Sequence, residues 1–352
     1  MPTWGEILNE LNASKDPRKY DAVRRKYLIQ LSQHTGRATI LYATKFASPG
    51  NAAPPDMLSI NDEDLQGLME VMHGITNPNL DLILHSPGGT IEAAEAIVLY
   101  LRSKFDDIRV IVPNLAMSAA TMISCAANRI IMGKHSFLGP IDPQFILNTS
   151  IGPRSVSAEA IREQFELAQE ECTDPSKLGA WIPMLSQYGP DLLKKCDHAC
   201  ALSKELVQTW LAQYMFKGQP DAKRKANKIA KWLSKHSLFK THGRHIPREA
   251  ARNQKLAIDD LEADQTLQDL VLSVFHATTH TFNATGGVKI IENHEGRAFV
   301  KSINVNVQLQ GIPQLAIQQP MRRVAPAQPT QPAPPATAPL PPPTITPPPA
   351  NP

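Results

Sequence analysis

The sequence predicts an α/β protein whose mostly parallel sheet is covered by helices. Strand-like runs alternate with amphipathic helical runs at short intervals from residue 37 onward, a pattern typical of parallel sheets. Residues 155–215 have helical periodicity, and from Gly311 the sequence becomes rich in Pro, Ala, Gln and Thr. We therefore expect N-terminal helices over 1–35, an α/β core over 36–150, a helical extension with the C-terminal part of the catalytic domain over 151–310, and a disordered Pro-rich tail over 311–352.

The chain up to residue 105 supplies four of the expected helices and the first two strands. Apolar residues at helical spacing over 4–35, interrupted at Pro17, predict two helices that cover the core. ATILYAT (38–44) is typical of a strand, and the acidic start and apolar spacing of NDEDLQGLMEVMHGI (61–75) predict a helix. DLILH (81–85) predicts the second strand, which the turn SPGG connects to the helix TIEAAEAIVLYLRSKF (90–105).

The pattern continues with a third strand, a helix of small residues and a fourth strand. These are IRVIVP (108–113), the stretch around Ser118, and RIIMG (129–133). The clearest periodic segments downstream are AEAIREQFELAQEE (158–171) and DLLKKCDHACALSKELVQTWLAQYM (191–215). GRHIPREAARNQKLAIDDLE (243–262) is typical of a loop, a helix and a return strand, and a further helix is expected over 264–284.

Charge and composition exclude several classes of function. The chain has 36 basic and 33 acidic residues, a balance too even to indicate nucleic acid as a partner, and the basic segment 217–256 is interpreted as a solvated helical face. The four cysteines lack paired CxxC spacing, so we expect reduced thiols and no metal site. No apolar run approaches the roughly 18 residues of a membrane span, and the N-terminus is unlike a signal peptide, which predicts a cytoplasmic protein.

Two turns carry the candidate chemistry, and each lies where a strand gives way to a helix. Gly88 and Gly89 in SPGG have no side chains, so their N–H groups can approach a ligand closely. Ser118 lies near the start of a helix, where free N–H groups favour a developing negative charge. SPGGT matches neither a dinucleotide fingerprint nor a P-loop, so no cofactor is expected. A serine nucleophile needs an oxyanion site and a base, and the two turns could supply these parts.

These motifs, in this order, resemble the Clp protease and signal peptide peptidase A superfamily, and within it the serine dehydrogenase proteinases. The resemblance rests on DLILHSPGGTIEAAEAI, on VIVPNLAMSAATMISCAANRIIMGKHSFLGPIDPQ and on HGRHIPREAARNQKLAIDDLE, and it extends over about residues 4–270. It implies a ClpP/crotonase-like fold of repeated strand–strand–helix units that assembles into oligomers. It also implies Ser118 as nucleophile, with the N–H of Ala119 and that of Gly88 or Gly89 binding the oxyanion.

The resemblance leaves the base open. Clp-type enzymes carry a His shortly after the nucleophile helix, but this sequence has Ile141 at that position, in GPIDP. Signal peptide peptidases use a downstream Lys, which would be Lys177 in DPSKLGAW, provided that its pKa is lowered toward neutrality. His135 is the alternative base, because its ordinary pKa already lies near neutrality. Asp142 either orients a base or forms a turn.

The resulting hypothesis is a cytoplasmic serine peptidase that acts on proteins or peptides. Two alternatives stay open: a catalytically weak scaffold that binds partners through its Pro-rich tail, and a crotonase-like hydrolase of acyl thioesters. We also expect a homo-oligomer whose interface uses helices from 155–215, since that segment carries many apolar residues, Trp210 among them. Membrane association is not evident.

Overall fold

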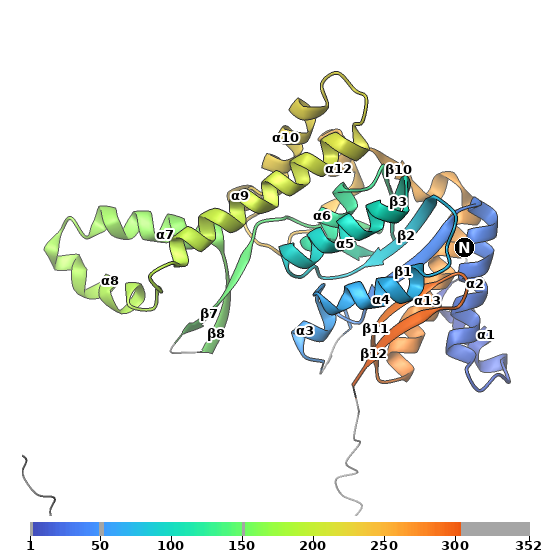
Figure 1. Cartoon of the computed structure of the whole chain (residues 1–352). Helices are drawn as coiled ribbons and strands as arrows, with labels where there is room; N and C mark the ends of the chain where they lie inside the picture. Colours follow the sequence, from blue (N-terminus) through green and yellow to red (C-terminus); the bar gives the residue numbers. More distant parts are fainter. Residues whose placement is uncertain (1–2, 49–52, 150–151, 304–352) are drawn as a thin grey trace, which may run out of the picture. The chain divides into compact units, whose positions relative to one another are not determined.

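The computed structural model describes residues 3–48, 53–149 and 152–303, and the chain from Met1 to Val305 forms one compact unit. The tail expected over 311–352 lies outside the described residues. The helical and strand segments predicted up to residue 133 are present, and they alternate along the chain as expected (Figure 1).

A seven-stranded sheet forms the centre of the unit. Its order is β10-β5-β3-β2-β1-β11-β12; the first five strands are parallel to one another, and β11 and β12 are antiparallel to their neighbours. The strands are β10 (Ile258–Asp260), β5 (Arg129–Met132), β3 (Asp107–Val112), β2 (Asn79–His85), β1 (Ala38–Thr44), β11 (Gly287–Asn293) and β12 (Ala298–Ser302). The prediction of a mostly parallel sheet flanked by helices is confirmed. The sequence analysis did not predict β11 and β12.

Helices cover both faces of this sheet, and apolar side chains fill the two layers between them. One layer packs α2 (Lys19–Thr35) and α13 (Gln265–Ala284) on the sheet through buried residues such as Leu31 and Val271. The other layer holds α4 (Glu63–Met72), α5 (Ile91–Lys104) and α6 (Ala119–Cys125). The remaining N-terminal helix, α1 (Trp4–Ala13), packs against α13 and α2. Burial of these apolar faces is the main favourable contribution to folding.

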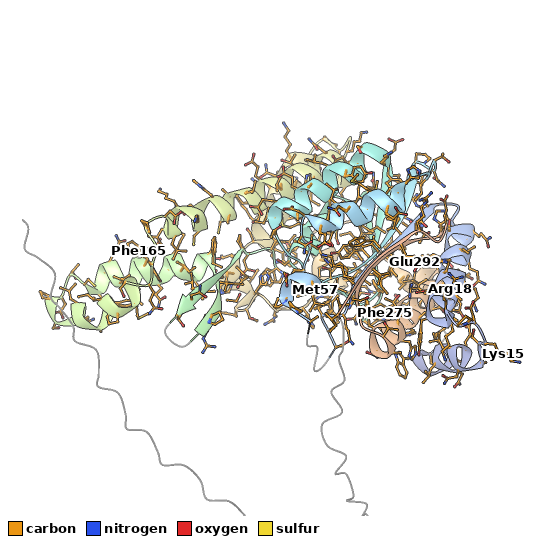
Figure 2. The ribbon with its side chains drawn as sticks, turned by 60° about the horizontal axis from the view of Figure 1, so that its bottom comes forward. Lys15, Arg18, Met57, Phe165, Phe275 and Glu292 are labelled. Atoms are coloured by element: carbon orange, nitrogen blue, oxygen red, sulfur yellow. The ribbon has the colours of Figure 1, made fainter. Side chains whose placement is uncertain are left out.

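A buried carboxylate fixes α2 to the sheet. Glu292 on β11, which is labelled in Figure 2, is fully buried. It accepts hydrogen bonds from two arginines of α2, from Arg24 Nε at 2.5 Å and from Arg25 Nη2 at 2.9 Å. Thr281 Oγ1 on α13 accepts a further bond from Arg24 at 2.9 Å. The buried charge is thus paired and hydrogen-bonded, as burial in an apolar interior requires.

The helical extension after residue 150 begins with a hairpin that the sequence analysis did not predict. Residues 155–157, expected to be helical, belong to β8 (Gly152–Ser157), which pairs antiparallel with β7 (Gln144–Thr149). The chain continues through α7 (Ala158–Glu171), the short 3₁₀ helix η1 (Pro175–Lys177), α8 (Leu178–Leu185) and α9 (Leu192–Trp210). A short π-helical segment, η2 (Leu211–Met215), then leads to α10 (Ala222–Leu233) and α11 (His236–Phe239).

The apolar residues at the end of α9 and in η2 lie in the core of the chain. Trp210, Leu211 and Met215 are buried in the layer that contains α6 and α10. Trp210 is therefore a residue of the subunit core, and the expectation that it lies in an interface is wrong. Between β7 and α11, the exposed large apolar side chains are instead on β7, α7, α8 and α11: Ile146, Leu167, Leu178, Ile182, Met184 and Leu238.

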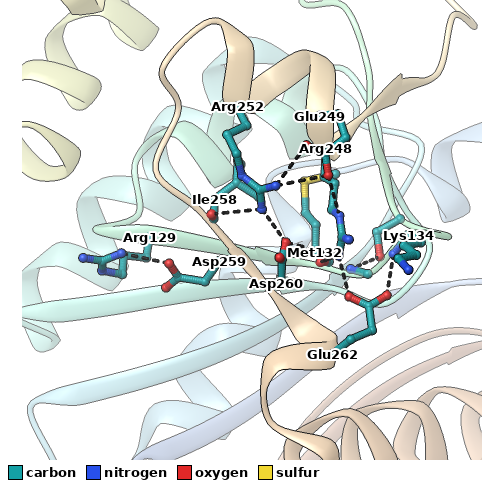
Figure 3. Close-up of polar contacts among 12 residues, drawn as sticks. Arg129, Met132, Lys134, Arg248, Glu249, Arg252, Ile258, Asp259, Asp260 and Glu262 are labelled. Atoms are coloured by element: carbon teal, nitrogen blue, oxygen red, sulfur yellow. Dashed lines mark hydrogen bonds and ion pairs between the residues drawn. The ribbon is translucent and has the colours of Figure 1, made fainter.

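A polar cluster ties the C-terminal segments to the end of β5 (Figure 3). Arg248, the first residue of α12 (Arg248–Asn253), is buried and donates to the Met132 carbonyl at 3.2 Å. It also pairs with Asp260 at 3.2 Å and with Glu262, whose carboxylate accepts from the Lys134 N–H at 2.8 Å. These contacts fix the position of α12 and β10, which follow the loop at 240–245.

His85 joins the end of β2 to the start of the next turn. Its ring is 4% exposed and lies between Phe46 and Phe275, with ring centroids 4.8 Å and 4.9 Å away (Phe275 is labelled in Figure 2). Its Nδ1 accepts a hydrogen bond from the Leu115 N–H at 3.3 Å. Burial lowers the pKa of His85 from 6.5 to about 4, so the ring is neutral in the folded protein near neutral pH.

Because the pKa of His85 is lowered in the folded protein, we expect the folded protein to lose stability in acid. The unfolded chain binds a proton at His85 below pH 6.5 and the folded chain does so only below about pH 4, so stability falls as the pH is lowered between these values. The expected loss is at most about 3 kcal/mol. In His85→Asn, whose amide oxygen can still accept from Leu115, urea unfolding should show a correspondingly weaker pH dependence over this interval. An unchanged pH dependence would contradict the assignment.

Candidate active site

Ser118 occupies a strained turn between a short strand and a helix. The strand β4 (Leu115–Ala116) precedes it and α6 begins at the next residue. Its φ of 53° and ψ of −120° place a non-glycine residue at positive φ. Such a conformation costs roughly 1–3 kcal/mol and persists where the surrounding structure enforces it, as at the nucleophile turns of hydrolases.

The SPGG turn packs directly against Ser118. Gly88 has a φ of 96°, and a Cβ at this position would lie 2.6 Å from Ser118 Cβ and 2.7 Å from the Met117 carbonyl oxygen. A Cβ on Gly89 would lie 2.0 Å from the Ile60 carbonyl oxygen. Both glycines are therefore required by close backbone approach, and the approach of Gly88 brings the two predicted turns into contact.

Two backbone N–H groups remain available beside Ser118. The Gly88 N–H donates to Ser86 Oγ at 3.2 Å, whereas within residues 3–48, 53–149 and 152–303 the N–H groups of Gly89 and Ala119 have no hydrogen-bond acceptor. Both residues line the same cavity as Ser118. Free N–H groups in the same cavity as a serine hydroxyl are the kind of donors that an oxyanion needs.

A buried ion pair holds the segment at Ser59 and Ile60, which is hydrogen-bonded to the Gly88–Gly89 turn. The Ile60 N–H donates to the Gly88 carbonyl at 2.7 Å, and the Ile60 carbonyl accepts from the Thr90 N–H at 3.1 Å. The preceding carbonyl, that of Ser59, accepts from Lys289 Nζ at 2.8 Å, and Lys289 is paired with Asp64 at 2.6 Å. Both charged side chains are fully buried, so the segment that holds the turn is rigidly anchored to β11 and α4.

A second sheet of three short strands brings together segments that are far apart in the sequence. Its order is β4-β6-β9, with β6 (Phe137–Leu138) parallel to β4 and antiparallel to β9 (Ile246–Pro247). Ser118 follows β4 closely, Asp142 follows β6, and His242 precedes β9. The sheet therefore delivers a serine, an aspartate and a histidine to one region of the fold.

His242 and Asp142 form a hydrogen-bonded pair. Asp142 is 2% exposed, and its Oδ1 lies 2.7 Å from Nδ1 of His242. Because a carboxylate only accepts, Nδ1 of His242 carries the donated proton, which leaves Nε2 of the neutral ring as an acceptor. The His242 side chain is 26% exposed and lines the cavity that also contains Ser118.

The cavity has a volume of about 490 Å³ and a mostly apolar lining. Ile91, Met122, Ile141, Phe145 and Ile146 line it together with the polar side chains of Ser59, Glu92, Gln144, Ser155 and His242. Ile141, which occupies the position of the Clp-type histidine in the sequence, is thus part of the cavity wall. A space of this size and character accommodates an apolar side chain beside a polar reaction centre.

The structure brings four of the predicted site residues together and leaves two elsewhere. Ser118, Ala119, Gly88 and Gly89 all line the cavity. Lys177 does not; it lies in η1, its side chain is 48% exposed, and its ammonium group is 3.5 Å from Glu171.

His135 is also absent from the cavity lining. Its partly buried ring packs on Gly133, and it lies near His276 of α13, whose pKa is lowered chiefly by burial and then by the neighbouring His280 and His135. The structure therefore does not bring Lys177 or His135 to Ser118.

The sequence analysis missed His242. This histidine opens the stretch HGRHIPREAARNQKLAIDDLE that carried part of the family resemblance, but no spacing rule links it to Ser118. The three histidines at 236, 242 and 245, which lie in α11 and in the loop between α11 and a short strand, were a usable signal. Asp142 was considered as an orienting group, and its contact with His242 is consistent with that interpretation.

Neither a metal-binding cluster nor a membrane-spanning helix is found among the described residues. Among them, no group of three or more His, Cys, Asp or Glu side chains is arranged to hold a metal ion. None of the helices in the described ranges is long and apolar enough to cross a bilayer. All four cysteines are free, and burial raises the pKa of Cys125 on α6 to about 12, which keeps this neighbour of the site a protonated thiol.

Two archaeal proteins are similar to this chain. It is 36% identical over 122 residues to the uncharacterized protein MJ0137 of Methanocaldococcus jannaschii, which covers 34% of this chain and 43% of the relative. It is 35% identical over 144 residues to the uncharacterized protein MJ1495 of the same organism, covering 38% of this chain and 47% of the relative. The chain thus spans less than half the length of these relatives.

A protein-family model also matches the chain, over residues 56–161. This segment contains the Gly88–Gly89 turn, Ser118 and Asp142. The family is described as ClpP-like SDH-type serine proteinase. The match confirms the resemblance predicted from the sequence: residues 56–161 carry the pattern of the ClpP-like SDH-type serine proteinases.

Proposed function

We propose that the protein is a serine peptidase in which Ser118 is the nucleophile and His242, oriented by Asp142, is the base. The observation that carries the proposal is the position of His242: it lines the cavity of Ser118 while its Nδ1 is held by a buried carboxylate at 2.7 Å. The family match and the strained backbone of Ser118 support the same proposal. His242 thereby takes the role for which Lys177 and His135 were considered.

The proposed reaction uses each of these groups in turn. Ser118 Oγ attacks the carbonyl carbon of the scissile peptide bond as its proton moves to Nε2 of His242. The N–H groups of Gly89 and Ala119 stabilise the resulting oxyanion, and Asp142 stabilises the imidazolium. The proton then passes to the leaving amine, and water, activated by the same histidine, hydrolyses the acyl-enzyme.

The residues that line the cavity suggest the kind of substrate. Its wall near Ser118 includes Met122 and Ile141, so a substrate with an apolar side chain beside the scissile bond fits best. Peptides and proteins are the proposed substrate class. We also propose that the protein is located in the cytoplasm and that it assembles into homo-oligomers.

The choice of base predicts how fast two variants react with a fluorophosphonate probe, compared with the wild-type chain. The wild-type chain should be labelled at Ser118, and His242→Ala should react about 10²- to 10⁴-fold more slowly, because it lacks the group that accepts the serine proton. Lys177→Ala should react at the wild-type rate, since that side chain is exposed and paired with Glu171. Rates are measured by fluorescence in gels, and the modified residue is identified by mass spectrometry.

The controls separate the alternatives. Ser118→Ala should not be labelled, and its circular dichroism should match that of the wild-type chain. A loss of labelling in Lys177→Ala but not in His242→Ala would contradict the proposed base. A folded wild-type chain that neither reacts at Ser118 nor cleaves peptides would favour the scaffold alternative, and cleavage of acyl thioesters but not peptides would favour the thioesterase alternative.

The proposed self-assembly predicts a role for the exposed face of α8. Ile182 is 60% exposed and lies near the exposed Leu178, so a charge there would oppose burial in an interface without disturbing the core. Ile182→Glu should lower the mass measured by light scattering, and the exposed neighbour change Gln187→Glu should not. An Ile182→Glu chain with the wild-type mass would exclude this face, and a monomeric wild-type chain would contradict assembly itself.

A further inference from the structure

Asp142 holds two imidazole rings. Its Oδ1 accepts from His242, and its Oδ2 lies 2.8 Å from Nδ1 of His236. The side-chain amide of Gln144 donates to the same Oδ2 at 2.8 Å. The carboxylate is 2% exposed, so these neighbours replace the water that would otherwise solvate it.

The two histidines differ in their surroundings. His242 lines the cavity. The side chain of His236 is 19% exposed, but it does not line the cavity. His236 is the first residue of α11, and its backbone N–H donates to Glu159 of α7 at 2.7 Å. The backbone and the ring of His236 are thus fixed to two different carboxylates, so its Nδ1 is held in place beside Asp142.

The two carboxylate oxygens of Asp142 have different roles. Because two donors fix Oδ2, the plane of the carboxylate is set and Oδ1 remains for His242. Without His236, only the Gln144 amide would hold Oδ2, so the carboxylate would be freer to rotate about its χ2 torsion and the imidazole of His242 would rotate with it. Small losses of alignment between a nucleophile and its base reduce the reaction rate strongly.

We propose that His236 is a positioning residue for the Ser118 reaction: by donating from Nδ1 to Oδ2, it orients Asp142 so that Oδ1 holds His242 toward Ser118. This inference rests on the proposed function and adds a residue to it. His236 itself touches neither the cavity nor the nucleophile. Only its hydrogen-bond donor, and not its titration, is required.

This proposal distinguishes two substitutions of similar size. In His236→Asn, the side-chain amide can place an N–H near the position of Nδ1, whereas His236→Leu fills the space without a donor. The maximal rate of phosphonylation of Ser118 should fall about 10- to 100-fold in His236→Leu, as expected for a lost hydrogen bond to a charged group. It should stay within about threefold of wild type in His236→Asn, and the probe concentration at half-maximal rate should change little in both variants.

The measurement uses the full chain and saturation kinetics with an alkyl fluorophosphonate, with thermal midpoints recorded for each variant. If His236→Leu does not fold, His236→Ala supplies a second variant without a donor. Wild-type rates in the donor-free variant would overturn the role of His236 alone, and equal losses in the Asn and Leu variants would do the same. A wild-type chain that is not labelled at Ser118 would overturn the proposed function, and this inference with it.

Discussion

The small sheet β4-β6-β9 is the constraint on which the site depends. Each of its strands is only two residues long, yet each lies within four residues in sequence of one member of the proposed triad. The pairing of Leu138 with both Ala116 and Ile246 fixes the three segments in register. A parallel bridge between Ser86 and Ala116 extends this arrangement to the SPGG turn, so one hydrogen-bonded unit positions the nucleophile, the base, its carboxylate partner and the oxyanion donors.

The close approach of Gly88 to Ser118 fixes the relative positions of the two turns. There is no space for a Cβ between this glycine and the Ser118 backbone, and Ser118 itself is held at positive φ. The surrounding packing offsets the energy of this strained turn, and the buried Lys289–Asp64 pair fixes the neighbouring segment through the hydrogen bond from Lys289 to the Ser59 carbonyl. Rigid support behind a strained nucleophile turn is what pre-organised catalysis requires, because alignment is then set before the substrate binds.

Local sequence patterns predicted most of the sheet and half of the site. Alternating strand and helix periodicity identified β1, β2, β3 and β5 because these strands are buried on both faces and nearly continuous in apolar residues. The SPGG turn and Ser118 were predictable because glycines and small residues at the end of a strand indicate a turn from the local sequence alone. The hairpin β7–β8 was not, since its strands are partly exposed and interrupted by polar residues.

The proposed base, His242, could not be predicted from the sequence because its position depends on the tertiary fold. His242 reaches the cavity only through the pairing of β9 with β6, and nothing near Ser118 in the sequence encodes that pairing. Lys177 was a candidate by family analogy and spacing alone, and spacing does not report the burial that would make a lysine basic at neutral pH. The same limit applied to Trp210, whose apolar helix was assigned to an interface and instead fills the core of its own chain.

The most direct test of the triad is a crystal structure of the protein phosphonylated by a fluorophosphonate. The account predicts phosphorus bonded to Ser118 Oγ, a phosphonyl oxygen within hydrogen-bond distance of the Gly89 and Ala119 N–H groups, and His242 beside Ser118 with its Nδ1 still on Asp142. Phosphorus on another residue would contradict the account. So would an adduct on Ser118 in which a lysine, and not His242, lies next to Oγ.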